Sequence, residues 1–120
     1  LGDVYKRQKE KYLPERKNLI FPINIFGWKK DNKKLISIIL KKYKDTNDLE
    51  VIKINSEGFV TLKEKFLQKI FLGSNNQEIE EKLNLIFDIK EQLKKQTIHK
   101  KIKSLDLTDL TIPEMKVFIP

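Results

Sequence analysis

The stretch FVTLKEKFLQKIFLG, residues 59–73, decides the fold because it holds two strand-forming runs in close succession. Phe59–Leu62 and Phe66–Leu72 are rich in apolar, aromatic and β-branched residues, which favour strands. The polar residues Lys63-Glu64-Lys65 separate the two runs and predict the turn between them. In the second strand we expect Phe66, Ile70 and Leu72 on one face, and Leu67 and Phe71 on the other.

The next stretch, SNNQEIEEKL (residues 74–83), predicts a helix directly after this second strand. Gly73 ends the strand, and Asn75 or Asn76 can cap a helix that we expect to reach Lys95. Glutamates in the first turns and lysines in the last turn suit the helix dipole. The predicted apolar stripe comprises Ile79, Leu83, Ile86, Ile89 or Lys90, and Leu93.

Another helix and four more strands are predicted around this unit. The helix spans Asp31–Lys44, with Asp31 or Asn32 as its cap. Its apolar stripe is Leu35, Ile36, Ile39, Leu40 and Tyr43. The strands are Leu19–Phe26, Val51–Ile54, Ile102–Leu107 and Met115–Ile119. Pro22 lacks a backbone donor, which indicates that the first strand is an edge strand or an irregular segment.

The element order is β-α-β-β-β-α-β-β, and hairpin-length connections join the middle strands. This pattern predicts an α+β fold: a largely antiparallel sheet of about five to six strands, with two helices on one face. Both helices need a common surface for their apolar stripes, and the sheet provides one. No internal repeat is visible in the sequence.

The first eight residues do not look native. Residues 3–8, DVYKRQ, can be back-translated as GAT GTG TAT AAG AGA CAG, which resembles the transposon end used as a sequencing-library adaptor. We therefore expect residues 1–8 to be an adaptor artefact. Residues 9–120 are then expected to form a single domain that is a fragment of a longer protein.

The composition narrows the choice of partners. A net charge of +8 suggests nucleic acid or an anionic membrane as a partner. However, the chain has no Ala, only two Arg and abundant Lys, Ile and Asn, as A/T-rich codons would produce. The absence of Cys excludes disulfides and thiolate metal sites. No segment has the about 20 apolar residues of a membrane span.

No residue pattern predicts catalysis or a cofactor. His99, the only histidine, lies in a polar connection, where a solvated side chain is expected. The glutamates at 78, 80 and 81 lie on different sides of one helical turn, so we expect dipole stabilisation and not a metal site. Asp106 and Asp109 flank Thr108, a spacing typical of turn capping. We predict that the protein is not an enzyme and binds no small-molecule substrate.

A basic surface with aromatic residues is the feature that favours nucleic-acid binding. Its lysines are Lys29, Lys30, Lys33, Lys34, Lys41, Lys42, Lys44, Lys100, Lys101 and Lys103. Trp28 and Tyr43 could stack on bases. Lysine-rich helix faces are normally solvated, and both aromatic residues are expected at the edge of the core. We therefore predict no nucleic-acid site, and a small basic nucleic-acid-binding module is the alternative function.

The C-terminal half resembles the FtsQ/DivIB family of bacterial cell-division proteins. The resemblance consists of a strand ending in Leu-Gly at Lys69–Gly73, a Lys-Leu-containing helix at Glu81–Ile86, and the segment Ile102–Thr108 followed by Pro113. Residues 108–113 depart from the family, which typically has a shorter Asn-Pro turn there. No partner-contacting residue of the family has a one-to-one match here.

The resemblance implies a non-catalytic divisome scaffold that acts in septum formation. Residues 9–120 would be most of the β domain, with a POTRA domain and a membrane helix missing upstream. Location at the bacterial inner (plasma) membrane, with this portion extracytoplasmic, is also implied. The expected partners are division proteins of the FtsB/FtsL type, bound by strand addition. An enzyme fragment that has lost its catalytic residues is a further rival.

The last predicted strand is the candidate docking site. A strand at the end of a chain often lies at a sheet edge, where unpaired backbone groups can accept another strand. Lys116 is the only charge within it. The hypothesis assigns partner binding to Met115, Lys116, Val117, Phe118 and Ile119. The alternative is that this strand simply completes the core.

Overall fold

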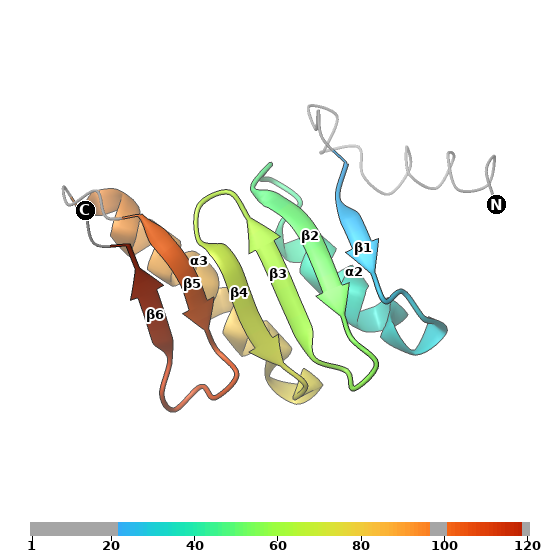
Figure 1. Cartoon of the computed structure of the whole chain (residues 1–120). Coiled ribbons are helices and arrows are strands. Elements are labelled where there is room, and N and C mark those ends of the chain that lie inside the picture. The colour runs from blue at the N-terminus through green and yellow to red at the C-terminus, as the bar shows by residue number, and fades with distance from the viewer. Residues whose placement is uncertain (1–21, 97–100, 119–120) are drawn as a thin grey trace.

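Six strands form one open sheet in which spatial order follows chain order (Figure 1). The structure is a computed structural model that describes residues 22–96 and 101–118. The strands are β1 (Asn24–Phe26), β2 (Leu49–Ile54), β3 (Val60–Glu64), β4 (Gln68–Gly73), β5 (Ile102–Asp106) and β6 (Glu114–Val117). Within the described residues this order places β1 and β6 at the two edges of the sheet, so the predicted edge position of the last strand is correct there.

Two helices, α2 (Lys33–Lys42) and α3 (Ile79–Lys95), cover the same face of the sheet (Figure 1). Each connects two neighbouring strands, so β1 pairs parallel with β2, and β4 pairs parallel with β5. The other three ladders are antiparallel. The predicted α+β fold with a largely antiparallel sheet is confirmed. The two parallel ladders follow from the helical crossovers, which return the chain to the end of the sheet where it started.

The structure repeats an order of elements that is not visible as a repeat in the sequence. β1–α2–β2–β3 and β4–α3–β5–β6 are two copies of one βαββ unit. In both copies a short 3-10 turn precedes the helix, Lys30–Asn32 in the first and Asn76–Glu78 in the second. The sequence hid this repeat because the copies share element order and not residue identity.

A glycine with positive φ ends the first strand of each copy, Gly27 at +85° and Gly73 at +73°. A Cβ atom at Gly27 would overlap the Ile54 carbonyl, and one at Gly73 would lie 3.0 Å from Thr108 Cγ2. Each glycine therefore lets its strand end close to the end of the parallel neighbour. Asn32 caps α2 without a side-chain bond to the helix, because its amide donates to the Gly27 carbonyl at 3.1 Å.

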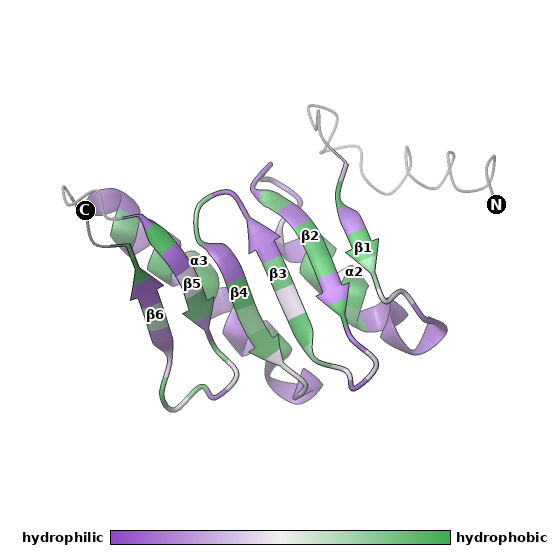
Figure 2. Ribbon diagram, viewed as in Figure 1, coloured by the Kyte–Doolittle hydropathy of each residue, from purple (hydrophilic) through white to green (hydrophobic). Residues whose placement is uncertain are grey.

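The core lies between the helices and the sheet. Leu35, Ile36, Ile39 and Tyr43 are its buried residues from the region of α2, and Ile79, Leu83 and Ile86 come from α3. The sheet contributes chiefly Ile52, Ile54, Leu62, Ile70, Leu72 and Leu105. The predicted helix stripes are thus largely correct, with Leu40 only half-buried. Apolar and polar residues alternate along the strands in Figure 2 because only one face of the sheet is covered.

The predicted turn at Lys63-Glu64-Lys65 was wrong by two residues. β3 continues through Glu64, which pairs with Gln68, so the chain turns at residues 65–67. Leu67 is fully buried in this turn, and its N–H donates to Glu64 Oε1 at 3.0 Å. The expected face-sharing of Phe66 with Ile70 and Leu72 fails for the same reason, because Phe66 precedes the strand.

Some predicted segments fall partly outside the described residues. In the first predicted strand only Asn24–Phe26 is described as strand, and residues 19–21 lie outside. Residues 1–8, His99 and Ile119 also lie outside. Within the described ranges, no helix is both long and apolar enough to span a membrane.

Candidate interaction site

The edge strand β6 is the first component of the candidate site. It pairs on one side with β5, through Ser104 with Lys116, Leu105 with Met115 and Asp106 with Glu114. Among residues 22–96 and 101–118, no strand pairs with its other side. Every residue of β6 is exposed, so this strand contributes no side chain to the buried core. Its unpaired backbone groups are therefore available for strand addition.

Apolar side chains accompany this open backbone edge. Met115 is 38% exposed, Val117 36% and Phe118 53%. The N–H of Phe118 donates to the Lys101 carbonyl at 2.9 Å, which holds the end of the strand against β5. Successive N–H groups of a strand point to opposite sides, so the N–H of Val117 points away from β5. Four of the five predicted docking residues are thus described and exposed, and Ile119 lies outside the described residues.

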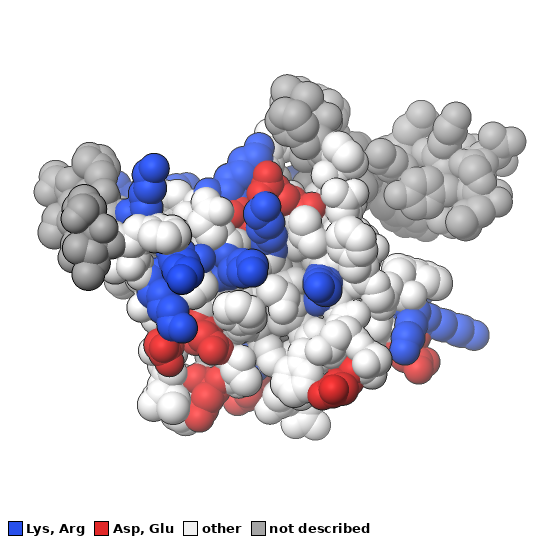
Figure 3. Space-filling model, viewed as in Figure 1, with Lys and Arg blue, Asp and Glu red and all other residues white. Residues whose placement is uncertain are grey.

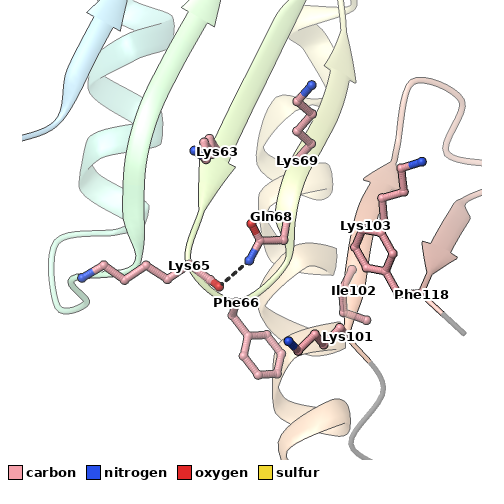
Figure 4. A pocket seen from close by; sticks show the side chains of 9 residues that line it. All are labelled: Lys63, Lys65, Phe66, Gln68, Lys69, Lys101, Ile102, Lys103 and Phe118. Atoms are coloured by element: carbon pink, nitrogen blue, oxygen red, sulfur yellow. Dashed lines mark hydrogen bonds between the residues drawn. The ribbon is translucent and has the colours of Figure 1, made fainter. Parts of the chain in front are cut away.

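A groove of about 640 Å³ lies close to this edge (Figure 4). Its lining comes from β3, the β3–β4 turn, β4, the start of β5 and the residue after β6. The lining residues are Lys63, Lys65, Phe66, Gln68, Lys69, Lys101, Ile102, Lys103 and Phe118. None of these is acidic, so the groove has a strongly positive lining.

The lysines of this groove gather on the face of the sheet that the helices leave open. Figure 3 shows Lys side chains over the middle of that face, with acidic side chains at its lower rim and a further acidic patch at its upper edge. Lys63 and Lys69 are exposed and stand directly opposite each other on β3 and β4. Like charges in directly opposed positions destabilise a sheet unless a counter-charge lies between them. Lys103 lies over the Phe118 ring, with Nζ 5.9 Å from the ring centroid.

A buried polar network joins the two helices to β3. Glu64 has no exposed surface and accepts a 2.6 Å bond from the Tyr43 hydroxyl and a 3.2 Å bond from Lys90 Nζ. Lys90 also donates to Asp48 Oδ2 at 2.7 Å. Burial, and next the Glu64 charge, raise the pKa of Tyr43 above its ordinary range. All these groups have partners inside the core, so the network is suited to stability and not to binding.

A second buried lysine fastens α3 to the ends of β4 and β5. Lys82 Nζ donates to the Leu72 carbonyl at 2.6 Å and to the Thr108 carbonyl at 3.3 Å. It also lies 3.9 Å from Glu78 Oε1. Sequence reasoning missed Lys82 and treated Lys90 only as an alternative to Ile89. The available signal was spacing, because Lys82 and Lys90 lie four residues on either side of the stripe residue Ile86.

The other residues singled out in the sequence have structural roles. Asp106 Oδ1 accepts from the N–H of Thr108 at 2.9 Å, so the predicted turn capping is confirmed. Asp109 Oδ1 accepts from the Thr111 hydroxyl at 2.6 Å and from its N–H at 2.9 Å, which lowers the pKa of Asp109. No three His, Cys, Asp or Glu side chains in the described part of the chain are placed to hold a metal ion.

The two aromatic residues expected at the edge of the core behave differently. Tyr43 is fully buried, whereas Trp28 is 60% exposed, so the prediction for Trp28 was wrong. Trp28 lies in the connection between Gly27 and the 3-10 turn at Lys30, outside both helix stripes. The burial of a side chain in such a connection depends on how the loop packs, which helical periodicity does not describe.

No protein-family model, curated protein or solved structure matches this chain. The described residues form an open α+β domain in which an exposed edge strand lies beside a lysine-lined groove. The FtsQ/DivIB resemblance stays a prediction.

Proposed function

We propose that this chain is a non-catalytic interaction domain that binds a partner by adding the partner's strand to β6. The observation that carries the proposal is that β6 is an edge strand with every residue exposed. Main-chain bonds to the open edge would provide affinity, and side chains on either face would provide selectivity.

The composition of β6 supports this role. Folded proteins commonly protect edge strands by keeping them short or by placing charged side chains, prolines or bulges in them. The chain brackets β6 with Pro113 and Pro120, and neither lies within the strand. Met115 and Val117 add apolar surface that a paired strand would cover. β6 is short and carries the charges of Glu114 and Lys116, so the exposed apolar side chains, and not an unprotected backbone, are what favour docking here.

We further propose that the partner is a division protein of the FtsB/FtsL type and that the domain acts in septum formation. This part rests on the FtsQ/DivIB resemblance, whose segments all fall within or just beyond the second βαββ unit. Lys69–Gly73 lies in β4, Glu81–Ile86 in α3, and Ile102–Thr108 covers β5 and its end. An extracytoplasmic position at the bacterial plasma membrane, anchored by an upstream helix, belongs to the same proposal.

The proposal is tested by Val117→Pro. Proline at this position removes an N–H that points away from β5, so it should disturb the added strand more than the fold. We expect affinity for an FtsB/FtsL-type extracytoplasmic segment, measured by biolayer interferometry, to fall by roughly tenfold or more, since one lost main-chain bond and a misfit at a docked edge together exceed about 1.4 kcal/mol.

Val117→Thr is the matched control, because it keeps the N–H and the β-branched shape. We expect its affinity to stay within about threefold of the parent, which corresponds to less than about 0.7 kcal/mol. Circular dichroism and thermal unfolding of both variants report whether the fold persists. Unchanged partner affinity in a folded Val117→Pro protein would show that β6 is not the docking site.

The alternative function, nucleic-acid binding, is supported by the lysine-lined groove. The aromatic rings in this groove are Phe66 and Phe118, not the predicted Trp28 and Tyr43, and lysines lie over both of them. Lys103 Nζ lies 5.9 Å from the centroid of the Phe118 ring, and Lys94 Nζ lies 5.8 Å from that of Phe66. Lysine cations thus cover part of the ring faces that bases would need.

A further inference from the structure

We propose that the lysine-lined groove binds the carboxylates of an acidic peptide segment, which belongs to the same partner that pairs with β6. The groove itself is argued from its own geometry, and only the identity of its occupant rests on the proposed function. Groove and edge would then form one composite site, in which β6 provides main-chain pairing and the groove provides charge selection.

The first argument is the separation of charge along β5 and β6. The start of β5 carries Lys101 and Lys103, both exposed and both in the groove. The opposite end of the two strands carries Asp106, Asp109 and Glu114. Figure 3 shows lysines over the middle of the face and acidic side chains at the lower rim below β5 and β6, while a further acidic patch lies at the upper edge near β2 and β3. An acidic segment is therefore attracted to the end of β5 and β6 that borders the groove, and is repelled from their opposite end.

The second argument is the absence of internal counter-charges for the central lysines. Ion pairs among residues 22–96 and 101–118 involve the ammonium groups of Lys82 and Lys90, and none includes Lys63 or Lys69. These two lysines nevertheless occupy directly opposed positions on adjacent strands, with their ammonium groups pointing in different directions (Figure 4). A carboxylate placed between them would replace repulsion with two favourable contacts.

The third argument is continuity with the docking edge. Phe118 both lines the groove and directly follows β6, and its N–H is bonded to Lys101, another lining residue. A segment that leaves the paired edge at Val117 therefore passes Phe118 first and reaches Lys69, three strand spacings or about 14 Å away, within roughly four to five residues. A nucleic acid has no peptide backbone that could pair with β6. Its bases would also find the Phe66 and Phe118 rings partly covered by lysine side chains.

The test uses an octaglutamate peptide with a fluorescent label and measures its affinity for the full chain by fluorescence anisotropy at low and at physiological salt. The groove variant is Lys63→Gln, Lys69→Gln and Lys103→Gln together. The matched control is Lys30→Gln, Lys33→Gln and Lys34→Gln, which removes the same charge from the lysine-bearing surface at the start of α2. All six side chains are exposed, so both variants should fold.

We expect the groove variant to bind octaglutamate roughly tenfold more weakly, whereas the control should change its affinity by less than about threefold. Equal weakening in both variants would overturn the proposal, because it would show attraction to net charge alone. Tighter binding of an eight-nucleotide oligo(dT), lost in the groove variant, would also overturn it and would assign the groove to single-stranded nucleic acid.

Val117→Pro separates this inference from the proposed function. Octaglutamate binding that is retained in Val117→Pro and lost in the groove variant supports the groove, whatever the result for strand addition. Partner binding that is lost in Val117→Pro but unchanged in the groove variant would support docking at β6 and overturn the proposed role of the groove.

Discussion

Glu64 is a carboxylate without exposed surface, and its neighbours determine what it does to stability. It accepts from the Tyr43 hydroxyl, from Lys90 and from the N–H of Leu67. The hydroxyl comes from the end of α2, the ammonium from α3 and the N–H from the β3–β4 turn. A buried charge of this kind is tolerated only while its cation and hydrogen-bond donors are in place.

We expect Lys90→Met to lower the free energy of unfolding by roughly 3–5 kcal/mol, because it leaves the Glu64 charge buried without its cation. Urea denaturation followed by circular dichroism measures this change. Lys95→Met is the control, since this exposed lysine lies on the same helix and should change stability by less than about 0.5 kcal/mol. Similar losses in the two variants would show that the buried pair has no special role.

The raised pKa of Tyr43 predicts how the free energy of unfolding changes at high pH. Burial and the Glu64 charge raise its pKa in the folded state, whereas the unfolded chain has a pKa of about 10. The contribution of Tyr43 is therefore fully present below about pH 10 and is lost as the pH rises further, because only the unfolded state releases the proton.

Above about pH 10, we expect the unfolding free energy of the parent to fall relative to Tyr43→Phe by up to about 1.4 kcal/mol per pH unit. Urea titrations of both proteins at about pH 8, 10 and 11 measure this difference. Because the two proteins differ only at residue 43, the comparison isolates the tyrosine. Parallel pH dependences would contradict the raised pKa.

At the scale of elements, the glycines that end β1 and β4 determine how closely parallel strands approach. Gly27, Gly58 and Gly73 all have positive φ, but their surroundings differ. A Cβ atom at Gly58 would meet no other atom within 4 Å, one at Gly73 would lie near the Thr108 side chain, and one at Gly27 would overlap a backbone carbonyl. Alanine at Gly58 therefore tests backbone strain alone, whereas alanine at Gly73 or Gly27 adds steric overlap to the same strain.

We expect the alanine substitutions to destabilise in the order Gly58→Ala, then Gly73→Ala, then Gly27→Ala. Gly58→Ala should lower the free energy of unfolding by about 1–2 kcal/mol, the ordinary cost of a left-handed conformation for an L-residue. Gly27→Ala should exceed this value, because the Ile54 backbone must move. Thermal and urea denaturation measure the order. Equal losses at Gly27 and Gly58 would contradict the close approach of β1 to the end of β2.

At the scale of the whole molecule, the two βαββ units share one core. Lys42 of α2 donates to Asn84 Oδ1 of α3 at 2.7 Å, and the Tyr43 and Phe87 rings meet edge-to-face with centroids 4.9 Å apart. The network around Glu64 also takes Tyr43 from the first unit and Lys90 from the second. These contacts join the helices over the β3–β4 hairpin, so the repeat yields one domain and not two.

Both surfaces proposed for binding depend on this arrangement. The helices occupy one face of the sheet, which leaves the opposite face open along β3, β4 and β5 (Figure 1). The second copy of the unit ends the sheet with β6, so the free edge and the groove lie close together. The repeat thereby supplies a composite surface that one unit alone would not provide.

Local patterns in the sequence determined the elements and the fold class. Helical spacing in residues 35–43 and 79–93 identified both helices and their buried stripes, because amphipathic periodicity is a property of one short segment. Strand composition, proline positions and the strand-ending Gly73 likewise act locally. The edge position of the last strand was also predicted, and four of the five proposed docking residues are exposed in the structure.

Only the tertiary structure determined which charged side chains are buried and which lysines line the same groove. Glu64, Lys82 and Lys90 are buried because donors and acceptors from distant segments satisfy them, and no local pattern contains those partners. The turn moved to residues 65–67 because Glu64 stays within the sheet. The groove joins Lys63 and Lys69 with Lys103 because β4 pairs with β5, where Lys69 lies opposite Ser104 from a segment 35 residues later in the chain, and sequence spacing alone does not determine this pairing.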